Sequence, residues 1–234
     1  MKTSAVLPAN HAAGVPGYLA ETYWWAYVHP RAIRLFERQW LVNLILWGRF
    51  GALRDWALAA LGIDRPGRTL QVACVYGDLT ARLLHGSAQG STLDVVDVLP
   101  LQLANLAQKL PAGSAVNIIR GDSADMDFAS GSYDRALLFF LLHEQPEAVR
   151  QATIAQTLRV VKPGGRVVIV DYHRPLKLNP LFLPMACILH TLEPFALDLW
   201  RRPITDWFPK DVKIASIEKT TSLGGLYQML TITM

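Results

Sequence analysis

Hydrophobic positions recur at helical spacing over residues 18–65. Apolar side chains such as Phe36, Trp40 and Leu44 lie four positions apart, and charged residues fall between them. The pattern predicts two or three helices, and Pro30 suits the first turn of one of them. Five of the seven tryptophans also lie here. We interpret this region as an N-terminal helical cap, whose tryptophan and arginine side chains also suit contact with lipid or a lipid-like substrate.

From residue 68 onward, short apolar runs alternate with helix-like segments. The runs RTLQVACVY, STLDVVDV, SAVNIIRGD, SYDRALLFFLL and GRVVIVDYH are typical of buried strands. Strands that are apolar on both faces predict a parallel sheet with helices on both sides. The last 23 or so residues predict two strands around Gly224 and Gly225, which form a closing antiparallel hairpin. We therefore expect an α/β, Rossmann-like fold with a seven-stranded, mostly parallel sheet.

Three boundaries follow from this pattern. Residues 1–17 show little periodicity and are expected to form a flexible lead. Residues 66–234 carry the strand–helix alternation of the main domain. Within it, residues 174–208 are apolar and punctuated by proline, which predicts an inserted segment that covers the substrate site.

Composition narrows the setting of the protein. The chain has 234 residues, of which 51% are hydrophobic and 18% charged, so one α/β domain with an attached segment can bury a full core. The net charge of +4, without a basic run, is compatible with an anionic membrane surface and does not indicate a nucleic-acid partner. Cys74 and Cys187 lack zinc-type spacing, which favours a reduced, cytoplasmic protein. No run approaches the roughly 18 apolar residues of a spanning helix.

Candidate chemistry lies where the predicted strands end, because open parallel sheets bind ligands at their carboxyl edge. The first strand leads into VYGDLT, which places Tyr76 and Gly77 in the first loop. The second ends in Asp97 and Val98, and Asp97 comes about 20 residues after Gly77. This is the usual distance for an acid that accepts hydrogen bonds from ribose hydroxyls, so we expect a nucleotide-like cofactor.

The third and fourth strands add further candidates. Asp122 and Ser123 follow the third strand, where a carboxylate can meet an adenine amine or the reacting end of a ligand. His143 and Glu144 follow the fourth strand, and they can bind a metal or a substrate or serve a structural role.

The segments VYGDLT, LDVVDVLPLQL, GDSADMDF and LRVVKPGGRVVIVDY, in this order, resemble class I S-adenosylmethionine (SAM)-dependent methyltransferases over roughly residues 66–234. The resemblance is greatest to quinone and lipid methyltransferases. The chain departs from that family in the first loop, where the usual acid is Gln71 and the first two glycines are Ala73 and Val75. Only Gly77 remains of residues that let the backbone approach a ligand. A degenerate, non-catalytic domain and an ordinary methyltransferase with an unusual loop are both open interpretations.

A more extensive resemblance includes the N-terminal helices. YWWAYVHPRAIRLFERQWLVNLILWG, VACVYGDLT, DVLPLQL and LLFFLLHEQP together are similar to the rhodoquinone-biosynthesis (RquA-type) family. This resemblance implies an enzyme that replaces a methoxy group of ubiquinone with an amino group, with SAM as the nitrogen donor and manganese (Mn²⁺) as a cofactor. Because a quinone tail needs an apolar groove, which residues 174–208 supply, we also expect a cytoplasmic protein that is peripheral at the inner membrane.

These expectations assign roles to the candidate residues. The cofactor-binding set is Tyr76, Gly77, Asp97, Val98, Asp122 and Ser123, and the catalytic set is Tyr76, Asp122 and His143. The metal candidates are Asp97, Asp122, His143 and Glu144, because manganese prefers carboxylate oxygens and accepts imidazole. A neutral Gln71 fits amino transfer, since a carboxylate there would keep the amine of SAM protonated. A methyltransferase acting on a quinone or lipid, and a non-catalytic SAM-sensing or quinone-carrying module, are the alternative functions.

Overall fold

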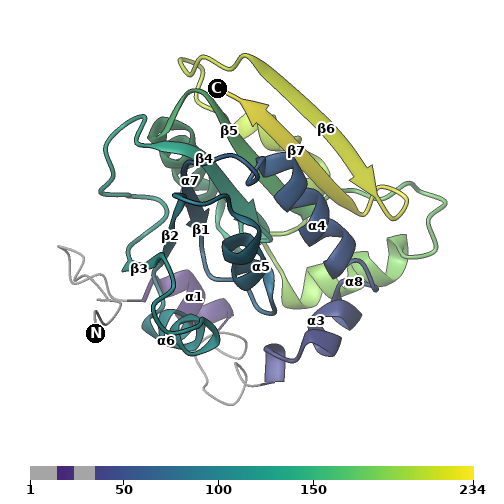
Figure 1. Cartoon of the computed structure of the whole chain (residues 1–234). Helices are drawn as coiled ribbons and strands as arrows, with labels where there is room; N and C mark the ends of the chain where they lie inside the picture. Colours follow the sequence, from purple (N-terminus) through teal and green to yellow (C-terminus); the bar gives the residue numbers. More distant parts are fainter. Residues whose placement is uncertain (1–14, 24–34) are drawn as a thin grey trace.

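Seven strands form a single sheet in the order β3-β2-β1-β4-β5-β7-β6 (Figure 1). The computed structural model describes residues 15–23 and 35–234. The strands β1 to β5 are parallel, and β7 lies antiparallel between β5 and β6. The mostly parallel sheet and its closing antiparallel hairpin are confirmed. The strands are β1 (Arg68–Val72), β2 (Thr92–Asp97), β3 (Val116–Arg120), β4 (Tyr133–Phe139), β5 (Val161–Tyr172), β6 (Ser216–Ser222) and β7 (Tyr227–Thr233).

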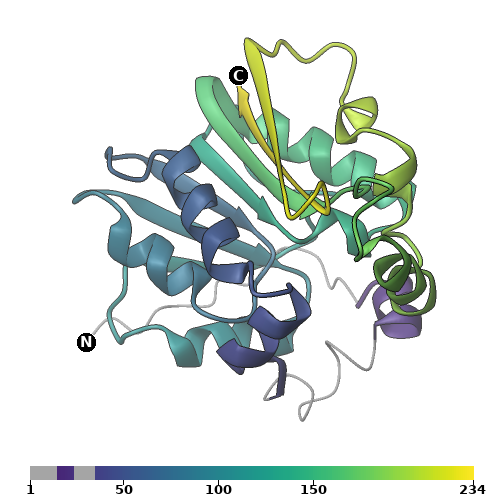
Figure 2. The ribbon, with the colours of Figure 1, turned by 90° about the vertical axis from the view of Figure 1, so that its right-hand side faces the viewer.

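Helices cover both faces of this sheet (Figures 1 and 2). Helix α4 packs on β4, β5 and β7, α6 packs near β2 and β3, and α7 packs on β5. Figure 1 shows α4 and α5 in front of the sheet and α7 behind it. The described helices are α1 (Gly17–Thr22), α3 (Gln39–Ile45), α4 (Phe50–Leu61), α5 (Leu79–Gly86), α6 (Pro100–Lys109), α7 (Glu147–Val160), α8 (Phe182–Leu192) and α9 (Asp198–Arg201), with 3-10 turns η2 (Leu142–Glu144) and η3 (Ile204–Trp207).

The core forms because the central strands are apolar on both faces. Leu70 and Val72 of β1 are fully buried, and Val72 is in register with Val96 of β2 and Leu138 of β4. Burial on both sides explains why these strands lack the alternation of half-exposed strands. The register also aligns the carboxyl ends of β1, β2 and β4 at one edge of the sheet.

The N-terminal helices and the insertion after β5 meet at this edge. Trp47, two residues after the end of α3, donates its indole N–H to the sulfur of Met185 in α8 at 3.1 Å. Tyr18 of α1 contacts the ring of Phe195, which follows α8, edge to face. Helix α4 belongs to the layer on the sheet, so among the described residues of the predicted cap it is α1 and α3 that lie over the edge. The helix start expected at Pro30 falls outside the described residues.

Candidate functional site

A cavity of about 690 Å³ lies beyond the carboxyl ends of the parallel strands. Its lining follows the strand ends, from Asp122 after β3 through Asp97 at the end of β2 to Tyr172 at the end of β5. Helices α3 and α8 add an apolar wall that includes Leu41 and Leu189. Polar groups at the strand ends and an apolar wall opposite them suit a ligand with a polar and a hydrophobic part.

The first loop keeps the backbone shape of a glycine loop without the glycines. Ala73 has φ of 71° and Gly77 has φ of 82°, so both adopt a left-handed conformation. Gln71 is fully buried under the loop; its amide Nε2 donates to the carbonyl of Ala73 at 2.9 Å, and its Oε1 accepts from the hydroxyl of Thr80. Gln71 therefore braces the loop, and it is not among the residues that line the cavity.

Gly77, expected to contact the cofactor, is also absent from the cavity lining. A Cβ atom at this position would come within 2.9 Å of Gln39 Oε1 and 3.1 Å of Phe50. The glycine is therefore required by the close approach of the N-terminal segment and by its positive φ, which few other residues adopt.

Tyr76 faces the cavity from the same loop. Its hydroxyl accepts a hydrogen bond from Nε2 of Gln102 at 2.7 Å, and its ring stacks on Phe36 with centroids 5.7 Å apart. Burial raises the pKa of Tyr76 well above its usual value. The phenol is therefore neutral near pH 7, which suits hydrogen bonding to a ligand and does not suit the role of a base.

An ionic clamp holds the loop from the outside. The ammonium of Lys109 donates to Glu37 Oε1 at 2.7 Å and to the carbonyls of Val75 and Gly77, each at 3.2 Å. Asn105 also donates to Glu37 Oε1. The residues Glu37 and Lys109 are 72 positions apart, so this clamp ties the N-terminal segment to α6 and to the loop between them.

Asp97 lies at the predicted ribose position and is buried. Its Oδ2 accepts from the backbone N–H of Cys74 at 2.7 Å, and its Oδ1 accepts from Leu99 N at 2.8 Å. Burial raises the pKa of Asp97, while these backbone donors oppose the rise. Each carboxylate oxygen has a second lone pair, so both can still accept from ribose hydroxyls. Val98, the next residue, also lines the cavity.

Asp122 and Ser123 both line the cavity beyond β3. Asp122 Oδ1 accepts from the backbone N–H of Ala124 at 2.8 Å, so the carboxylate shapes its own turn. The hydroxyl of Ser123 lies 2.9 Å from Thr153 Oγ1 and accepts from Nε2 of Gln145. These bonds fix the adenine side of the predicted cofactor site to α7.

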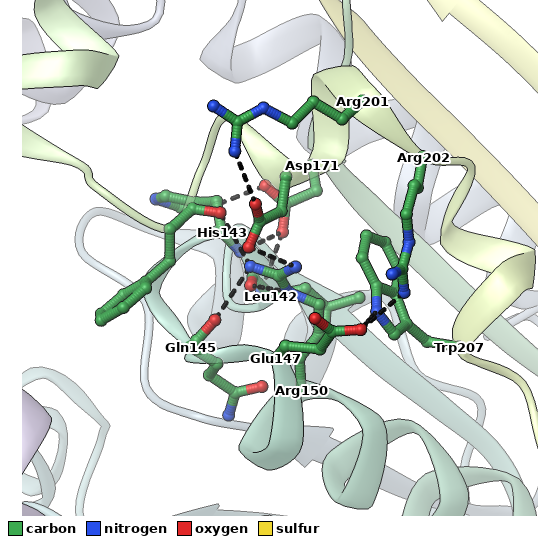
Figure 3. Close-up of polar contacts among 11 residues, drawn as sticks. Leu142, His143, Gln145, Glu147, Arg150, Asp171, Arg201, Arg202 and Trp207 are labelled. Atoms are coloured by element: carbon green, nitrogen blue, oxygen red, sulfur yellow. Dashed lines mark hydrogen bonds and ion pairs between the residues drawn. The ribbon is translucent and has the colours of Figure 1, made fainter.

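His143 forms a buried pair with Asp171 (Figure 3). Its Nδ1 lies 2.9 Å from Asp171 Oδ1, and its backbone N–H and that of Leu142 donate to Asp171 Oδ2. Behind this turn, the buried guanidinium of Arg150 donates to the carbonyls of Leu142 and Gln145. The imidazole is thus held rigidly where it lines the cavity.

The charge state of His143 follows from these neighbours. Burial alone would lower its pKa, but the carboxylate of Asp171 outweighs burial and raises the pKa to about 9. Glu144 Oε1 lies 3.8 Å from Nε2 on the other side of the ring. At pH 7 the ring is therefore an imidazolium, which can donate a hydrogen bond to a ligand oxygen.

The four metal candidates do not come together as a ligand set. Within residues 15–23 and 35–234, no group of three or more His, Cys, Asp or Glu side chains is arranged to hold a metal ion. Nδ1 of His143 is engaged by Asp171. The residues present therefore do not fit the expected manganese site, and no step is assigned to a metal.

The structure adds lining residues that sequence patterns did not identify. Tyr18 reaches the cavity from α1, Gln102 from α6, and Glu193 from the end of α8. Phe140 adopts φ of 53° and packs edge to face on His143. Gln102 falls within the LPLQL run after Asp97, a signal that could have been used. The others depend on how distant segments meet.

In the described ranges, no helix has the length and apolar character needed to cross a membrane.

Comparisons with known proteins identify the family of this chain. A family model described as "Methyltransferase domain" matches residues 69–165. An uncharacterized methyltransferase of Synechocystis sp. is 31% identical over 70% of this chain and 72% of its own length. A 2-phytyl-1,4-naphtoquinone methyltransferase of Synechococcus elongatus is 30% identical over 66% of this chain, and the match spans 64% of that protein.

Solved structures show the same fold. An O-methyltransferase family protein from Burkholderia thailandensis superposes with a TM-score of 0.63 over 87% of this chain and 59% of that protein, at 17% identity. At this identity the likeness concerns the fold alone. The sequence relative from Synechocystis sp. shows the family, and with the observed fold this chain belongs to the class I SAM-dependent methyltransferases.

Proposed function

We propose that this chain uses SAM to modify the ring of a lipid quinone, and that it replaces a methoxy group of ubiquinone with an amino group to give rhodoquinone. The observation that carries the proposal is a single cavity bounded by Asp97 at the ribose position and by the apolar wall of α3 and α8. Its volume of about 690 Å³ lies in the usual range for small-molecule sites. A nucleoside and a hydrophobic ring can therefore meet in one enclosure.

The altered loop supports amino transfer over methyl transfer. Ala73, Val75 and Tyr76 line the cavity where the amino-acid end of SAM lies in the family, and neutral Gln71 replaces the usual acid. Without a carboxylate at Gln71, the α-amine of SAM loses a partner that would favour its protonated form. A neutral amine has the lone pair that attack on a quinone ring requires.

In the first step, the amine nitrogen of SAM replaces the methoxy group on the quinone ring. The amine nitrogen forms a bond to the ring carbon that carries the methoxy group, and a proton leaves the nitrogen. The carbon–oxygen bond breaks, and the methoxy group takes a proton and departs as methanol. This leaves an adduct in which the nitrogen joins the quinone ring to the α-carbon of SAM. Rhodoquinone is released when that nitrogen–carbon bond breaks by elimination: the nitrogen keeps the electron pair and takes a proton, while the neighbouring β-carbon loses a proton and a carbon–carbon double bond forms in the remainder of SAM. In the first step imidazolium His143 donates a hydrogen bond to the quinone oxygen, where negative charge develops. Neutral Tyr76 orients the amine, and Asp122 lines the cofactor end.

Methyl transfer to a quinone is the second candidate. It is favoured by one relative, whose name gives it as a 2-phytyl-1,4-naphtoquinone methyltransferase. The same cavity would hold the same two ligands, but the sulfonium methyl group would face the ring.

The quinone substrate implies work at a membrane surface, and we include this in the proposal. Apolar side chains are exposed beside the cavity mouth, such as Trp40 at 58% and Leu44 at 64% in α3. Peripheral attachment at the cytoplasmic face of the inner membrane would present this mouth to quinone dissolved in lipid.

Isotope transfer tests the function directly. The protein is incubated with ubiquinone and SAM carrying heavy nitrogen in one reaction and a heavy methyl group in another, with and without added manganese. Heavy nitrogen in an aminoquinone supports amino transfer. A heavy methyl group in the product would instead show that the enzyme transfers a methyl group, and amino transfer would be wrong. Absence of both labels, with SAM binding retained, would show a non-catalytic module.

A further inference from the structure

A second, strongly basic cavity lies outside the catalytic one. It has a volume of about 400 Å³ and lies between the start of the insertion after β5, the α9 region and β6. Five cationic side chains and one histidine line it, and no carboxylate does. These six residues are His173, Arg174, Lys177, Arg201, Arg202 and Lys219.

Most of this positive charge is not neutralised. Arg201 and Arg202 each pair with an acid, at 3.3 and 2.6 Å, outside the cavity lining. Arg174, Lys177 and Lys219 have no carboxylate within 4.0 Å in the part of the chain that the structure describes. Burial lowers the pKa of Lys219.

The cationic side chains supply the hydrogen-bond donors of this pocket. Trp200 also lines it, but its indole N–H is buried and out of reach of a ligand there. His173 Nδ1 is already paired with the carbonyl of Gly225 at 2.8 Å. A pocket lined by several cations and by no acid suits an anion with several oxygen acceptors, such as a phosphate group.

Exposed leucines lie in this pocket and in the chain that follows it, and of the three Leu176 lines the pocket itself. Leu176 and Leu178, on either side of Lys177, are 69% and 98% exposed, and Leu183 in the first turn of α8 is 76% exposed. A soluble phosphate ligand gives no reason for water-exposed leucines beside its site. A bilayer does, because apolar side chains enter the acyl boundary while lysines stay at the phosphates.

We propose that this basic pocket binds the phosphate of an anionic phospholipid, while Leu176, Leu178 and Leu183 insert beside it. Helix α8 connects this lipid site to the catalytic cavity, because its later residues Ile188 and Leu192 line the cavity mouth and are exposed. Docking here turns that mouth toward the bilayer. The inference concerns attachment and does not depend on which group the enzyme transfers.

Vesicle partition tests the site without any activity assay. The full chain is mixed with phosphatidylcholine vesicles with or without phosphatidylglycerol, and the bound fraction is measured by sedimentation. We expect stronger binding to the anionic vesicles. Lys177→Glu and Lys219→Glu should each weaken that binding about fivefold or more, since each lysine near an anionic surface contributes about 1 kcal/mol. Leu178→Ser should weaken binding that persists at high salt, and at 98% exposure it cannot disturb the core.

Arg65→Glu is the matched control. Arg65 is exposed before β1, at the opposite end of the parallel strands, and the change alters net charge by the same amount. If Arg65→Glu weakens vesicle binding as much as Lys219→Glu does, attraction is generic and the proposal is wrong. Calorimetric binding of inorganic phosphate without vesicle partition would identify a soluble ligand instead. Binding of an oligonucleotide in place of vesicles would likewise overturn the lipid assignment.

Discussion

His143 Nδ1 lies 2.9 Å from Oδ1 of Asp171, and the pair joins the turn after β4 to the end of β5. Asp171 is fully buried and accepts four hydrogen bonds, three of them from the backbone N–H groups of Leu142, His143 and Tyr172. It therefore sets both the position and the charge of the imidazole that faces the cavity.

Asp171→Asn should destabilise the fold strongly. The amide nitrogen of asparagine would face donors where the carboxylate now accepts, and breaking a buried charged pair costs about 3–5 kcal/mol. Denaturant unfolding measures this loss. Asp206→Asn removes an exposed acid and should change stability by less than about 0.5 kcal/mol. Equal effects of the two substitutions would contradict the pairing described here.

Stability should fall at alkaline pH through the same pair. The pKa of His143 is raised in the folded state to about 9 from an ordinary value of 6.5. A raised pKa means that the stabilisation is complete below about 6.5 and is lost as pH rises through about 9. Unfolding free energies between these limits should show a decline for the wild type that His143→Gln lacks. A decline of the same slope in the variant would assign it to other groups.

Ala73→Gly should stabilise the loop. Ala73 has φ of 71°, where a side chain costs roughly 1–2 kcal/mol and glycine costs little. Part of this gain is offset by the greater freedom of glycine in the unfolded chain, so we expect a net gain of about 0.5–1 kcal/mol. Val75 lies in the same loop but does not have a positive φ. Val75→Gly should therefore lower the stability of the protein. Thermal unfolding of the two variants distinguishes these signs.

Asp97→Asn should weaken cofactor binding. An asparagine keeps one acceptor oxygen but loses the charge, and hydrogen bonds to charged groups contribute about 1.5–3 kcal/mol. Calorimetry with S-adenosylhomocysteine should show affinity reduced by at least about tenfold. Asp94→Asn is the control, because Asp94 is a buried acid of the same strand that binds Arg68, Asn117 and Tyr133. It should lower stability and leave affinity unchanged.

Lys109→Met should loosen the cofactor loop. Lys109 neutralises Glu37 and holds the carbonyls of Val75 and Gly77. Loss of these bonds adds an ordering cost to cofactor binding, so we expect affinity for S-adenosylhomocysteine to fall about fivefold, or about 1 kcal/mol. Lys162→Met removes an exposed lysine paired with Asp134 and should have no such effect. Unchanged affinity in Lys109→Met would show that the loop is rigid without the clamp.

Local sequence was enough to predict the sheet and to place Asp97 at its carboxyl edge. Buried parallel strands require runs such as VVIV in β5, which cannot belong to half-exposed strands. Asp97 was identifiable because its distance from the first loop reflects one strand–helix–strand unit of fixed length. The surrounding lining residues Asp122, Ser123 and His143 followed from the rule that ligands bind at strand ends, and they line one cavity.

The exact roles within the first loop were not predictable. The sequence showed that Gln71 replaces an acid and that Ala73 replaces a glycine. It did not show that the Gln71 side chain turns under the loop to Thr80, or that Ala73 keeps a left-handed backbone. The sequence also did not show that Gln39 and Phe50 leave no room for a side chain at Gly77. That steric contact depends on how the N-terminal segment packs against the loop.

By itself, then, the sequence determined which strands are buried on both faces and where Asp97 lies at the end of its strand. It also determined the apolar character of the N-terminal helices and of the insertion. Only the tertiary structure decided which distant residues meet. Asp171 reaches His143 across 28 positions, Glu37 reaches Lys109 across 72, and Lys219 joins Arg174 in a basic pocket. The physical reason is that periodicity reports the surroundings of a residue along its own element. Contacts between elements follow from sheet order and register, which no local pattern contains.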